Sequence, residues 1–487
     1  MSSPPMLATL TLHSEQVYGV LKYMRTKTAP GPDTIHVPFI SKASLLVIEL
    51  LTETFNASWR YGVVPRQWKE ANAFGIYKKG DISDPYSYRL ICITSVVMRV
   101  FERLVNTRLR EFFSANRFFS KWQAGFMKGH STMDCIYRLH EAIFSAISKR
   151  KRLPVLFLDI IKAFDRVSHA HLLYKLFLAG VVGKAWGWLR AFLADRRFRT
   201  TQGRHHSDWF PATAGVPQGC VLSPLLFAVF INDLDIDHHA IMTCMFADDV
   251  VAWPSLSLSH SHPTNIRLMR EYTDGVSEWT HDSGGSELSA DKTQITEFSS
   301  HREESRFRSI PIEVNGRVVV RTDHQRYLGL IFQANGKWDR QFDAVAAKTS
   351  VTANLIARIN HRNRNPSPLV TSTLVRTMLI PQMSYAFPFW RPTKTQYERL
   401  LQIIAIPLRR ALGMPRSSSA VRLLWEFGIP SPPVIRSRVL LECLSRACRS
   451  TTITCLACWS MTSRPLTPPH TLPPSMPAPS SMKLPLS

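Results

Sequence analysis

Two adjacent aspartates, Asp248 and Asp249, are the residues of this chain whose types and setting are best suited to chemistry. They lie in residues 242–254, MTCMFADDVVAWP, between two runs of apolar residues. Apolar β-formers on both sides of a short polar break predict a β-hairpin that carries both carboxylates at its tip. Neighbouring carboxylates on a buried strand pair repel each other, so they are costly unless a cation lies between them. Carboxylate oxygens suit Mg²⁺, with Mn²⁺ as the alternative ion.

An adjacent acidic pair is weak evidence alone, because a chain with 36 acidic residues contains such pairs by chance. A solvated turn is the alternative interpretation. Residues 153–164, LPVLFLDIIKAF, add a second carboxylate, because they predict a short buried strand that ends at Asp159. Two strands that each deliver an aspartate would place the carboxylates around a pair of ions. Such a pair stabilises both the attacking and the leaving oxygen of an in-line phosphoryl displacement.

A basic cluster follows the strand predicted over residues 71–77. Lys78 and Lys79 come directly after that strand, and Arg89 lies a few residues further on. Because arginine offers a planar fork and lysine a point charge, the three predict a clamp for a triphosphate. A solvated basic loop is an equally good interpretation of these residues alone.

Residues 215–224, GVPQGCVLSP, form a tight loop before a helix predicted over 225–234. Its glycines let the backbone approach a ligand closely, so the loop could lie under a nucleotide or a base pair. Gln218 is the side chain in the loop that is able to reach such a partner by hydrogen bonds.

Helices and loops must position these groups. Residues 97–113 form the most regular predicted helix, with one apolar face and arginines at 99, 103, 108 and 110 on the rest. These arginines could follow phosphates, although a solvated helix face is the simpler account. A Gly-punctuated loop over 123–134 leads into a helix at 136–147, and residues 170–194 predict a helix pair. Residues 318–332 predict another hairpin.

Composition narrows the class of partner. The 487 residues are 45% hydrophobic, which is typical of a globular chain and not of a disordered one. The net charge is +24, with a pI near 10, and basic residues recur along most of the chain. An extended polyanion is the natural partner of such a chain, and a merely soluble basic protein is the alternative.

Eight scattered cysteines indicate a reducing compartment. Four of them lie in apolar segments and are predicted as buried thiols: Cys92, Cys135, Cys220 and Cys244. Cys455 and Cys458 form a lone CxxC, for which zinc is the less favoured interpretation. No signal peptide or membrane span is visible, so we expect a soluble intracellular protein without membrane contact.

The order of the motifs resembles the reverse transcriptases of non-LTR retrotransposons, most of all the jockey-like elements. The resemblance covers about residues 15–430. It rests on motifs in the order of the family, which are APGPD at 29–33, KKGD and YR at 78–89, QAGF at 123–126, LDIIKAFD at 158–165, GVPQGCVLSPLLF at 215–227, FADD at 246–249, ADKT at 290–293 and YLG at 327–329.

The resemblance implies an α+β fold, that of a right-hand polymerase with fingers, a palm built on a small antiparallel sheet plus helices, and a helical thumb. The expected layout is an N-terminal extension at 1–26, fingers at 27–150, a palm with insertions at 151–335, a thumb-like helical region at 336–442 and a Pro-rich disordered tail at 443–487.

The resemblance also implies roles for the site residues. Asp159, Asp248 and Asp249 match the three metal-binding aspartates of the family. Lys292 matches a lysine proposed to donate a proton to the leaving pyrophosphate. Phe164 matches the aromatic residue that crowds the sugar C2′ position and so favours deoxynucleotides.

The remaining implied roles concern the nucleotide. Gln218 matches a glutamine near the incoming nucleotide and template. Arg89, with Lys78 or Lys79, matches the basic pair on the triphosphate, and the sequence does not choose between the lysines. Asp165 has a counterpart that we interpret as structural.

The implied activity is RNA-directed DNA synthesis with two Mg²⁺ ions. A primer 3′-hydroxyl attacks the α-phosphate of a dNTP, with RNA as template and DNA as primer or target. The family context implies action in the nucleus, while the sequence itself is compatible with nucleus or cytoplasm. The endonuclease domain of longer family members is expected to be encoded elsewhere or lost.

Three departures from the family pattern stand at Leu90, Met127 and Cys220, where proline, arginine and serine are usual. None removes a metal ligand, but Met127 deletes a charge from a loop near the template. A decayed or domesticated copy that binds nucleic acid without synthesis is therefore the alternative function. A group II intron maturase is a third interpretation, and GVPQGCVLSP and ADKT fit the retrotransposon pattern better.

Overall fold

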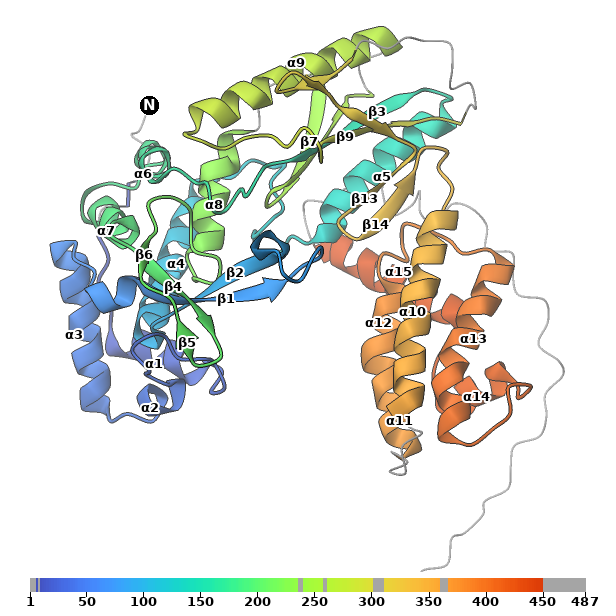
Figure 1. The fold of residues 1–487 in the computed structure, drawn as a ribbon, viewed down its shortest axis with the longest axis horizontal. Coiled ribbons are helices and arrows are strands. Elements are labelled where there is room, and N and C mark those ends of the chain that lie inside the picture. Colours follow the sequence, from blue (N-terminus) through green and yellow to red (C-terminus); the bar gives the residue numbers. More distant parts are fainter. Residues whose placement is uncertain are drawn as a thin grey trace, which may run out of the picture. The chain divides into compact units, whose positions relative to one another are not determined.

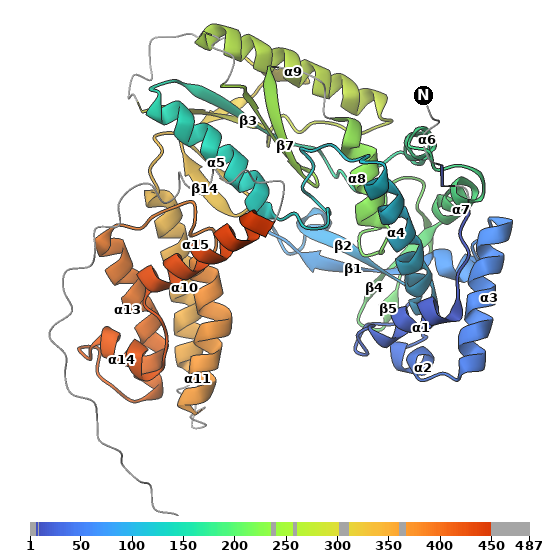
Figure 2. The same ribbon diagram turned by 180° about the vertical axis from the view of Figure 1, so that it is seen from behind.

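The computed structural model divides into two compact units, Met1–Gln341 and Phe342–Ser487, each of which is described by itself. Figure 1 shows the elements of both units, and Figure 2 shows them from behind. The structure describes residues 6–7, 9–234, 240–256, 261–300, 311–359 and 367–449. The Pro-rich tail from residue 450, with the zinc candidates Cys455 and Cys458, lies outside the described residues.

A five-stranded sheet at the centre of the first unit carries the predicted hairpin. Its strand order is β12-β9-β3-β8-β7, and every pair is antiparallel except β12 with β9, which is parallel. The predicted small antiparallel sheet is therefore mixed at one edge. Its strands are β3 (Leu153–Asp159), β7 (Ile241–Phe246), β8 (Asp249–Pro254), β9 (Gln294–Phe298) and β12 (Val320–Thr322).

The central strand β3 explains why this sheet is stable. Six of its seven residues, LPVLFL, are buried, and only the final Asp159 reaches partial exposure. A strand covered on both faces reads as a continuous apolar run instead of an alternating one. Helices α5 (Thr132–Ser148) and α9 (His262–Asp282) pack on this sheet, as Figures 1 and 2 show.

A second sheet of the first unit joins segments that are far apart in the sequence. Strand β1 (Glu70–Tyr77) pairs antiparallel with β2 (Tyr88–Thr94) and parallel with β4 (Arg197–Gln202). Short strands β5 (His205–His206) and β6 (Phe210–Pro211) complete it on β4. The β1–β4 pairing follows from no local pattern, and the sequence did not predict it.

Helix α4 (Val96–Ala115) packs into the core of the first unit with the predicted apolar face. It contacts α1 (Ser14–Lys22), while α3 (Leu45–Tyr61) packs on α7 (Gly183–Leu193). Helix α8 (Ser223–Ile231) is buried on every side, as expected for nine residues with no charge. The other α-helices in the described part of this unit are α2 (Val37–Ser41) and α6 (His169–Leu178), and short 3-10 helices lie at Arg66–Lys69, Pro85–Ser87 and Asn232–Leu234.

Two short hairpins complete the first unit. They are β10 (Glu313–Val314) with β11 (Arg317–Val318), and β13 (His324–Tyr327) with β14 (Leu330–Gln333). The second one confirms a hairpin in the predicted region. Its tight turn has left-handed backbone at Leu328 and Gly329.

The second unit is helical in its described part, from Phe342 in α10 (Asp339–Ile359) onward. A π-helical turn over Val375–Leu379 joins α11 (Pro368–Leu374) to α12 (Ile380–Ser384). The unit then continues with α13 (Lys394–Ala411), α14 (Ala420–Glu426) and α15 (Pro432–Arg449). Helix α15 thus includes the first seven residues of the predicted tail.

Three of the four cysteines predicted as buried, Cys135, Cys220 and Cys244, are buried free thiols, while Cys92 is partly buried. No helix among the described residues combines the length and the apolar character needed to cross a membrane.

Candidate active site

The two predicted carboxylate strands lie side by side. Asp159 at the end of β3 is paired in register with Asp249 at the start of β8. Directly opposed residues of an antiparallel pair project from the same face of the sheet, so their carboxylates are neighbours. Asp248 precedes Asp249 in the two-residue turn that follows Phe246. The structure therefore brings together all three predicted metal-binding aspartates.

The turn that carries Asp248 is strained. Ala247, its first residue, has φ of 59°, a left-handed conformation that non-glycine residues rarely adopt. Two-residue hairpin turns need positive φ at that position, which usually brings glycine there. Strain of this kind costs about 1–3 kcal/mol and persists where the surrounding structure determines it.

The pKa values of Asp248 and Asp249 are raised. Burial raises the pKa of Asp249 to about 6, and the charges of Asp248 and Asp159 contribute to the shift. Burial likewise raises the pKa of Asp248, with Asp159 adding to the rise, while Arg89 and Lys78 act in the opposite direction. Asp249 nevertheless keeps much of its surface in solvent. The pKa of about 6 is therefore explained by partial desolvation of the carboxylate and by the negative charges of Asp248 and Asp159.

Lys292 lies on the same carboxylate cluster. Its Nζ is 3.2 Å from Oδ2 of Asp159, and both side chains are substantially exposed. The loop before β9 brings it there, because the backbone N–H groups of Ser289 and Ile161 join the 287–293 segment to the end of β3. The sequence predicted the importance of Lys292 but not this ion pair.

The donor set fits a hard divalent cation, since carboxylate oxygens are the ligands that Mg²⁺ prefers and their mutual repulsion calls for positive charge. Within the described ranges, however, no three His, Cys, Asp or Glu side chains are already arranged to hold an ion. Asp159 is engaged by Lys292 in this arrangement. The residues thus supply the right donors, without a finished coordination shell.

Strand alternation places one lysine of the predicted clamp beside Arg89. Ile76 on β1 is paired with Arg89 on β2, and the N–H of Lys78 donates to the carbonyl of Ser87 at 2.8 Å. Lys78 lies two residues beyond Ile76, so it shares the face of Arg89. The charges of Lys78 and Arg89 both act on Asp248 and oppose the rise in its pKa.

Lys79 lies two residues beyond the end of β1, in a bend, so strand alternation does not place its side chain on the face of Arg89. The opposite face of the β1–β2 pair carries Tyr77 and Tyr88, whose rings are in edge contact with centroids 5.7 Å apart. Lys79 is also not among the charges that shift Asp248. The charge of Lys78, and not that of Lys79, therefore acts on Asp248.

Gln218 lies against the residue that we interpreted as structural. Its Nε2 donates to Oδ1 of Asp165 at 3.0 Å. The backbone carbonyl of Gln218 accepts a hydrogen bond from the backbone N–H of Cys92 on β2 at 2.7 Å. A Cβ on Gly219 would lie 2.4 Å from the Cys92 carbonyl oxygen, so only glycine permits this approach. The close approach that Gly219 permits here is to the backbone of β2.

Phe164 is held by rings on two sides. Phe227 from α8 is stacked on it with centroids 4.1 Å apart and planes 14° from parallel. Phe126 from the QAGF loop meets it edge-on, with centroids 6.0 Å apart and planes at 90°. The carbonyl of Phe164 accepts from the N–H of Val216 at 2.8 Å.

Helix α4 ties three motif loops together through polar side chains. Arg99 Nη2 donates to the carbonyl of Ala29 in APGPD, and Arg110 Nη1 donates to the carbonyl of Phe126 in QAGF at 2.8 Å. Arg108, by contrast, pairs with Glu111 at 3.2 Å on the helix surface. Two of the four arginines thus bind backbone carbonyls, and neither phosphate binding nor a simple solvated face describes them.

The third tie of α4 is Glu102, which sequence reasoning missed. This fully buried carboxylate accepts the N–H groups of Val221 and Leu222 at 2.7 and 3.0 Å, at the start of α8. Burial raises its pKa, and these bonds oppose the rise. The sequence did contain a signal that Glu102 is buried, which is its helical spacing. Met98 lies four residues before it and Val105 three residues after it, on the same apolar stripe.

The QAGF loop runs along β7. The N–H of Ala124 donates to the carbonyl of Met245 at 2.8 Å, and that of Met245 donates to Trp122 at 2.9 Å. A Cβ on Gly125 would lie 2.1 Å from the Ala247 nitrogen. Glycine here is therefore what allows the loop to contact the turn that holds Asp248.

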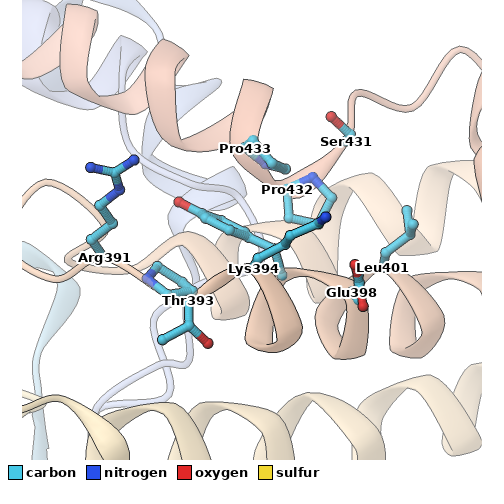
Figure 3. A pocket seen from close by; sticks show the side chains of 10 residues that line it. Arg391, Thr393, Lys394, Glu398, Leu401, Ser431, Pro432 and Pro433 are labelled. Atoms are coloured by element: carbon cyan, nitrogen blue, oxygen red, sulfur yellow. The ribbon is translucent and has the colours of Figure 1, made fainter. Parts of the chain in front are cut away.

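The second unit contains a cavity of about 630 Å³ that involves none of the predicted site residues. Figure 3 shows Arg391, Thr393 and Lys394 at the start of α13, across from Pro432 and Pro433 at the start of α15. Its residues lack the carboxylate pairing found in the first unit.

The sequence matches the reverse transcriptase (RNA-dependent DNA polymerase) family over residues 76–332. This match covers more than half of the chain and includes the three aspartates and Lys292. The chain therefore belongs to this family. The predicted fold class is therefore confirmed.

Three curated relatives from Drosophila melanogaster are polymerases of mobile elements. The RNA-directed DNA polymerase from mobile element jockey is 27% identical over 435 residues, covering 85% of this chain and 45% of that protein. The probable RNA-directed DNA polymerase from transposon BS is 32% identical, and the match covers 54% of this chain and 30% of that protein. The probable RNA-directed DNA polymerase from transposon X-element is 27% identical, and the match covers 82% of this chain and 43% of that protein. The predicted resemblance to jockey-like elements is confirmed. The chain spans less than half the length of these relatives.

Among solved structures, the chain is similar to apo telomerase from Candida tropicalis truncated from its C-terminal domain. The identity is 12% and the TM-score 0.36, with 63% of this chain and 62% of that chain covered.

Proposed function

We propose that this chain is an RNA-directed DNA polymerase that transfers a nucleotidyl group from a dNTP to a primer 3′-hydroxyl on an RNA template. The observation that carries the proposal is the pairing of Asp159 with Asp249 across β3 and β8, with Asp248 in the adjoining turn. Three carboxylates at the end of one sheet are an arrangement for phosphoryl transfer, because that reaction needs positioning and charge stabilisation more than covalent chemistry.

Asp159, Asp248 and Asp249 would hold two Mg²⁺ ions, with Mn²⁺ as a substitute. When bound, these ions would make the primer hydroxyl more acidic and neutralise charge on the leaving pyrophosphate. The raised pKa of Asp249, about 6, supports this assignment, because the protein alone leaves the negative charge of the cluster poorly compensated.

The basic residues around the cluster have separate roles in this proposal. Lys78 and Arg89 bind the triphosphate from one face of the β1–β2 pair. Lys292, on the Asp159 carboxylate, donates a proton to the leaving pyrophosphate. Lys292 pairs with Asp159, whereas the charges of Lys78 and Arg89 act on Asp248.

Two further residues select the nucleotide. Phe164 crowds the sugar C2′ position and excludes a 2′-hydroxyl, and its stacked packing on Phe227 suits a rigid gate. Gln218 lies near the incoming nucleotide and template, on a loop fixed to β2 by the N–H of Cys92. The net charge of +24 favours RNA template and DNA primer as the polyanionic partners.

We propose nuclear action on chromosomal DNA, in keeping with the mobile elements for which the relatives are named. Microscopy of a tagged chain tests this, since exclusion from the nucleus would contradict it.

The decisive experiment measures dNTP incorporation on an RNA template with a DNA primer, with Mg²⁺ and with EDTA. The test variant is Asp248→Asn, Asp249→Asn. The matched control is Asp274→Asn, Asp282→Asn, which removes the same charge from the exposed surface of α9. We expect extension that requires metal, survives in the control and vanishes in the test variant.

A folded chain that binds primer–template but extends nothing would instead indicate a nucleic-acid-binding relic. Extension that persists in the double variant would show that the chemistry lies elsewhere.

A further inference from the structure

The ring of Phe164 has one rigid neighbour and one that depends on a loop. Phe227 lies inside α8 and is 1% exposed, so its position is set by the core. The backbone of Phe164 is likewise fixed by the 2.8 Å bond from Val216. Phe126, which meets the ring edge-on, belongs to no helix or strand. The angle of the Phe164 ring is therefore determined in part by how firmly that loop holds Phe126.

Phe126 has a backbone conformation that other contacts must enforce. Its φ is 63°, in the left-handed region that bulky residues avoid. The N–H of Gly125 donates to Oε1 of the buried Gln123 at 2.9 Å, and the N–H of Ala124 donates to Met245 at 2.8 Å. These bonds anchor the N-terminal side of the residue, before its carbonyl.

Arg110 holds the carbonyl of Phe126 itself, with Nη1 at 2.8 Å. The guanidinium is half-buried, and burial lowers its pKa. Among the residues that the structure describes, no carboxylate pairs with it. This half-buried charge restrains the Phe126 carbonyl strongly, because an ionised donor makes a stronger hydrogen bond than a neutral one.

We propose that Phe126 is a positioning residue for sugar selection, which sets the Phe164 ring against the 2′ position of the incoming nucleotide, and that Arg110 fixes Phe126 for this purpose. This inference rests on the proposed polymerase function and on the role of Phe164 as the sugar gate. A ring supported on one side only can swing away and admit a 2′-hydroxyl. Loss of Phe126 should therefore raise the use of ribonucleotides more than it lowers the use of deoxynucleotides.

The test compares selectivity, defined as kcat/KM for a dNTP divided by kcat/KM for the matching rNTP, in single-nucleotide extension on an RNA template. The variants are Phe126→Ala, Phe126→Leu and Arg110→Met, with Phe164→Ala as the reference for a lost gate. Edge-on aromatic pairs contribute about 0.5–1.5 kcal/mol, so we expect selectivity to fall roughly threefold to tenfold in the Phe126 variants. Arg110→Met should act in the same direction.

Two matched controls separate positioning from general damage. Phe119→Ala removes another half-buried phenylalanine that follows α4 and packs edge-on against Phe113. Arg108→Met removes an exposed arginine of the same helix that pairs with Glu111. Both should leave selectivity within about twofold of wild type. In the Phe164→Ala background, Phe126→Ala should lower selectivity no further, because both changes remove the same contact.

Each outcome has a distinct meaning. If the folded wild type incorporates no dNTP, the proposed function is wrong and this inference falls with it. If the wild type extends but Phe164→Ala keeps its selectivity, Phe164 is not the gate, and the inference loses its basis. If Phe164→Ala loses selectivity while Phe126→Leu and Arg110→Met keep it, the inference alone is wrong. Phe126→Leu preserves most of the buried volume, so the test remains decisive even if Phe126→Ala does not fold.

Discussion

Asp159 and Asp249 are cross-strand partners that carry like charges on the same face of the sheet. Directly opposed like charges destabilise a strand pair. The apolar remainder of β3 and β8 offsets that cost, since Leu156, Phe157 and Leu158 face buried partners from Val250 to Ala252. The end of the sheet where the chemistry is proposed is therefore less stable than an apolar strand pair would be there. Active sites commonly contain destabilising arrangements of this kind.

The first prediction is that Asp249→Asn stabilises the metal-free protein above pH 6. The pKa of Asp249 is raised to about 6, so the folded state keeps a proton that the unfolded state loses near pH 4. The resulting penalty is absent below pH 4, grows between pH 4 and 6, and is complete above pH 6. After allowance for solvent exposure we expect a gain of about 1 kcal/mol at pH 8 and almost none at pH 4.

Chemical unfolding in EDTA at both pH values measures this difference. Asp274→Asn on α9 is the control and should change neither value by more than about 0.5 kcal/mol. An equal gain at pH 4 and pH 8 would show that the carboxylate charge is not the cause.

The second prediction ranks the two lysines of the clamp. Lys78 shares the face of Arg89 and reaches Asp248, whereas Lys79 does not. A charge-assisted hydrogen bond contributes about 1.5–3 kcal/mol, so Lys78→Ala should raise KM for dNTP roughly tenfold or more. Lys79→Ala should change it less than about twofold. Steady-state extension kinetics measure KM for dNTP in both variants. A larger rise of KM in Lys79→Ala than in Lys78→Ala would contradict the assignment.

The third prediction concerns Lys292 as a proton donor. Its pair with Asp159 is exposed, so Lys292→Met should change the free energy of unfolding by less than about 1 kcal/mol. General acid catalysis contributes a factor of about 10²–10⁴, so kcat should fall by at least that lower factor with KM little changed. Arg317→Met breaks the exposed pair of Arg317 with Asp291 and should leave kcat intact. A rise in KM alone would instead indicate a binding role.

The sequence could propose the three aspartates as candidates because each ends or follows an apolar strand pattern, and the family resemblance then implied their roles. The same patterns predicted α4, its apolar face and the two hairpins. What they could not supply were contacts between segments far apart in the chain. Helical periodicity shows that Arg110 lies off the apolar face, yet it cannot show that a loop carbonyl lies within its reach.

Two other features were beyond the sequence for related reasons. The parallel pairing of β1 with β4 joins segments separated by several helices. The choice between Lys78 and Lys79 depends on strand register, which a one-residue shift would reverse.

The fourth prediction is that Gly125→Ala damages the catalytic turn. An added Cβ would meet the backbone nitrogen of Ala247 at 2.1 Å and the carbonyl carbon of Phe246 at 2.9 Å, and neither atom can move aside as a side chain could. Overpacking of this kind costs about 1–3 kcal/mol. We expect a lower melting temperature together with a loss of kcat that exceeds what unfolding explains. Gly187→Ala, within α7 and with open space at its Cβ, should be neutral or stabilising.

The fifth prediction tests Glu102 as the anchor of the Gln218 loop. Glu102→Ala leaves the part-buried N–H of Val221 and the buried N–H of Leu222 without their acceptor, at a cost of about 1–3 kcal/mol for a buried group. Glu102→Gln keeps a carbonyl oxygen at that place and should recover most of the stability. Urea unfolding should therefore order the proteins as wild type, Glu102→Gln and Glu102→Ala, from most to least stable.

The control for this series is Glu111→Ala, which removes an exposed glutamate from the same helix, where it pairs with Arg108. It should cost less than about 1 kcal/mol, because exposed ion pairs contribute little. If Glu102→Ala were as mild as Glu111→Ala, the buried carboxylate would not be what holds the loop. If Glu102→Ala is severe and Glu102→Gln is mild, the acceptor geometry of Glu102, and not its charge, fixes the loop that carries Gln218.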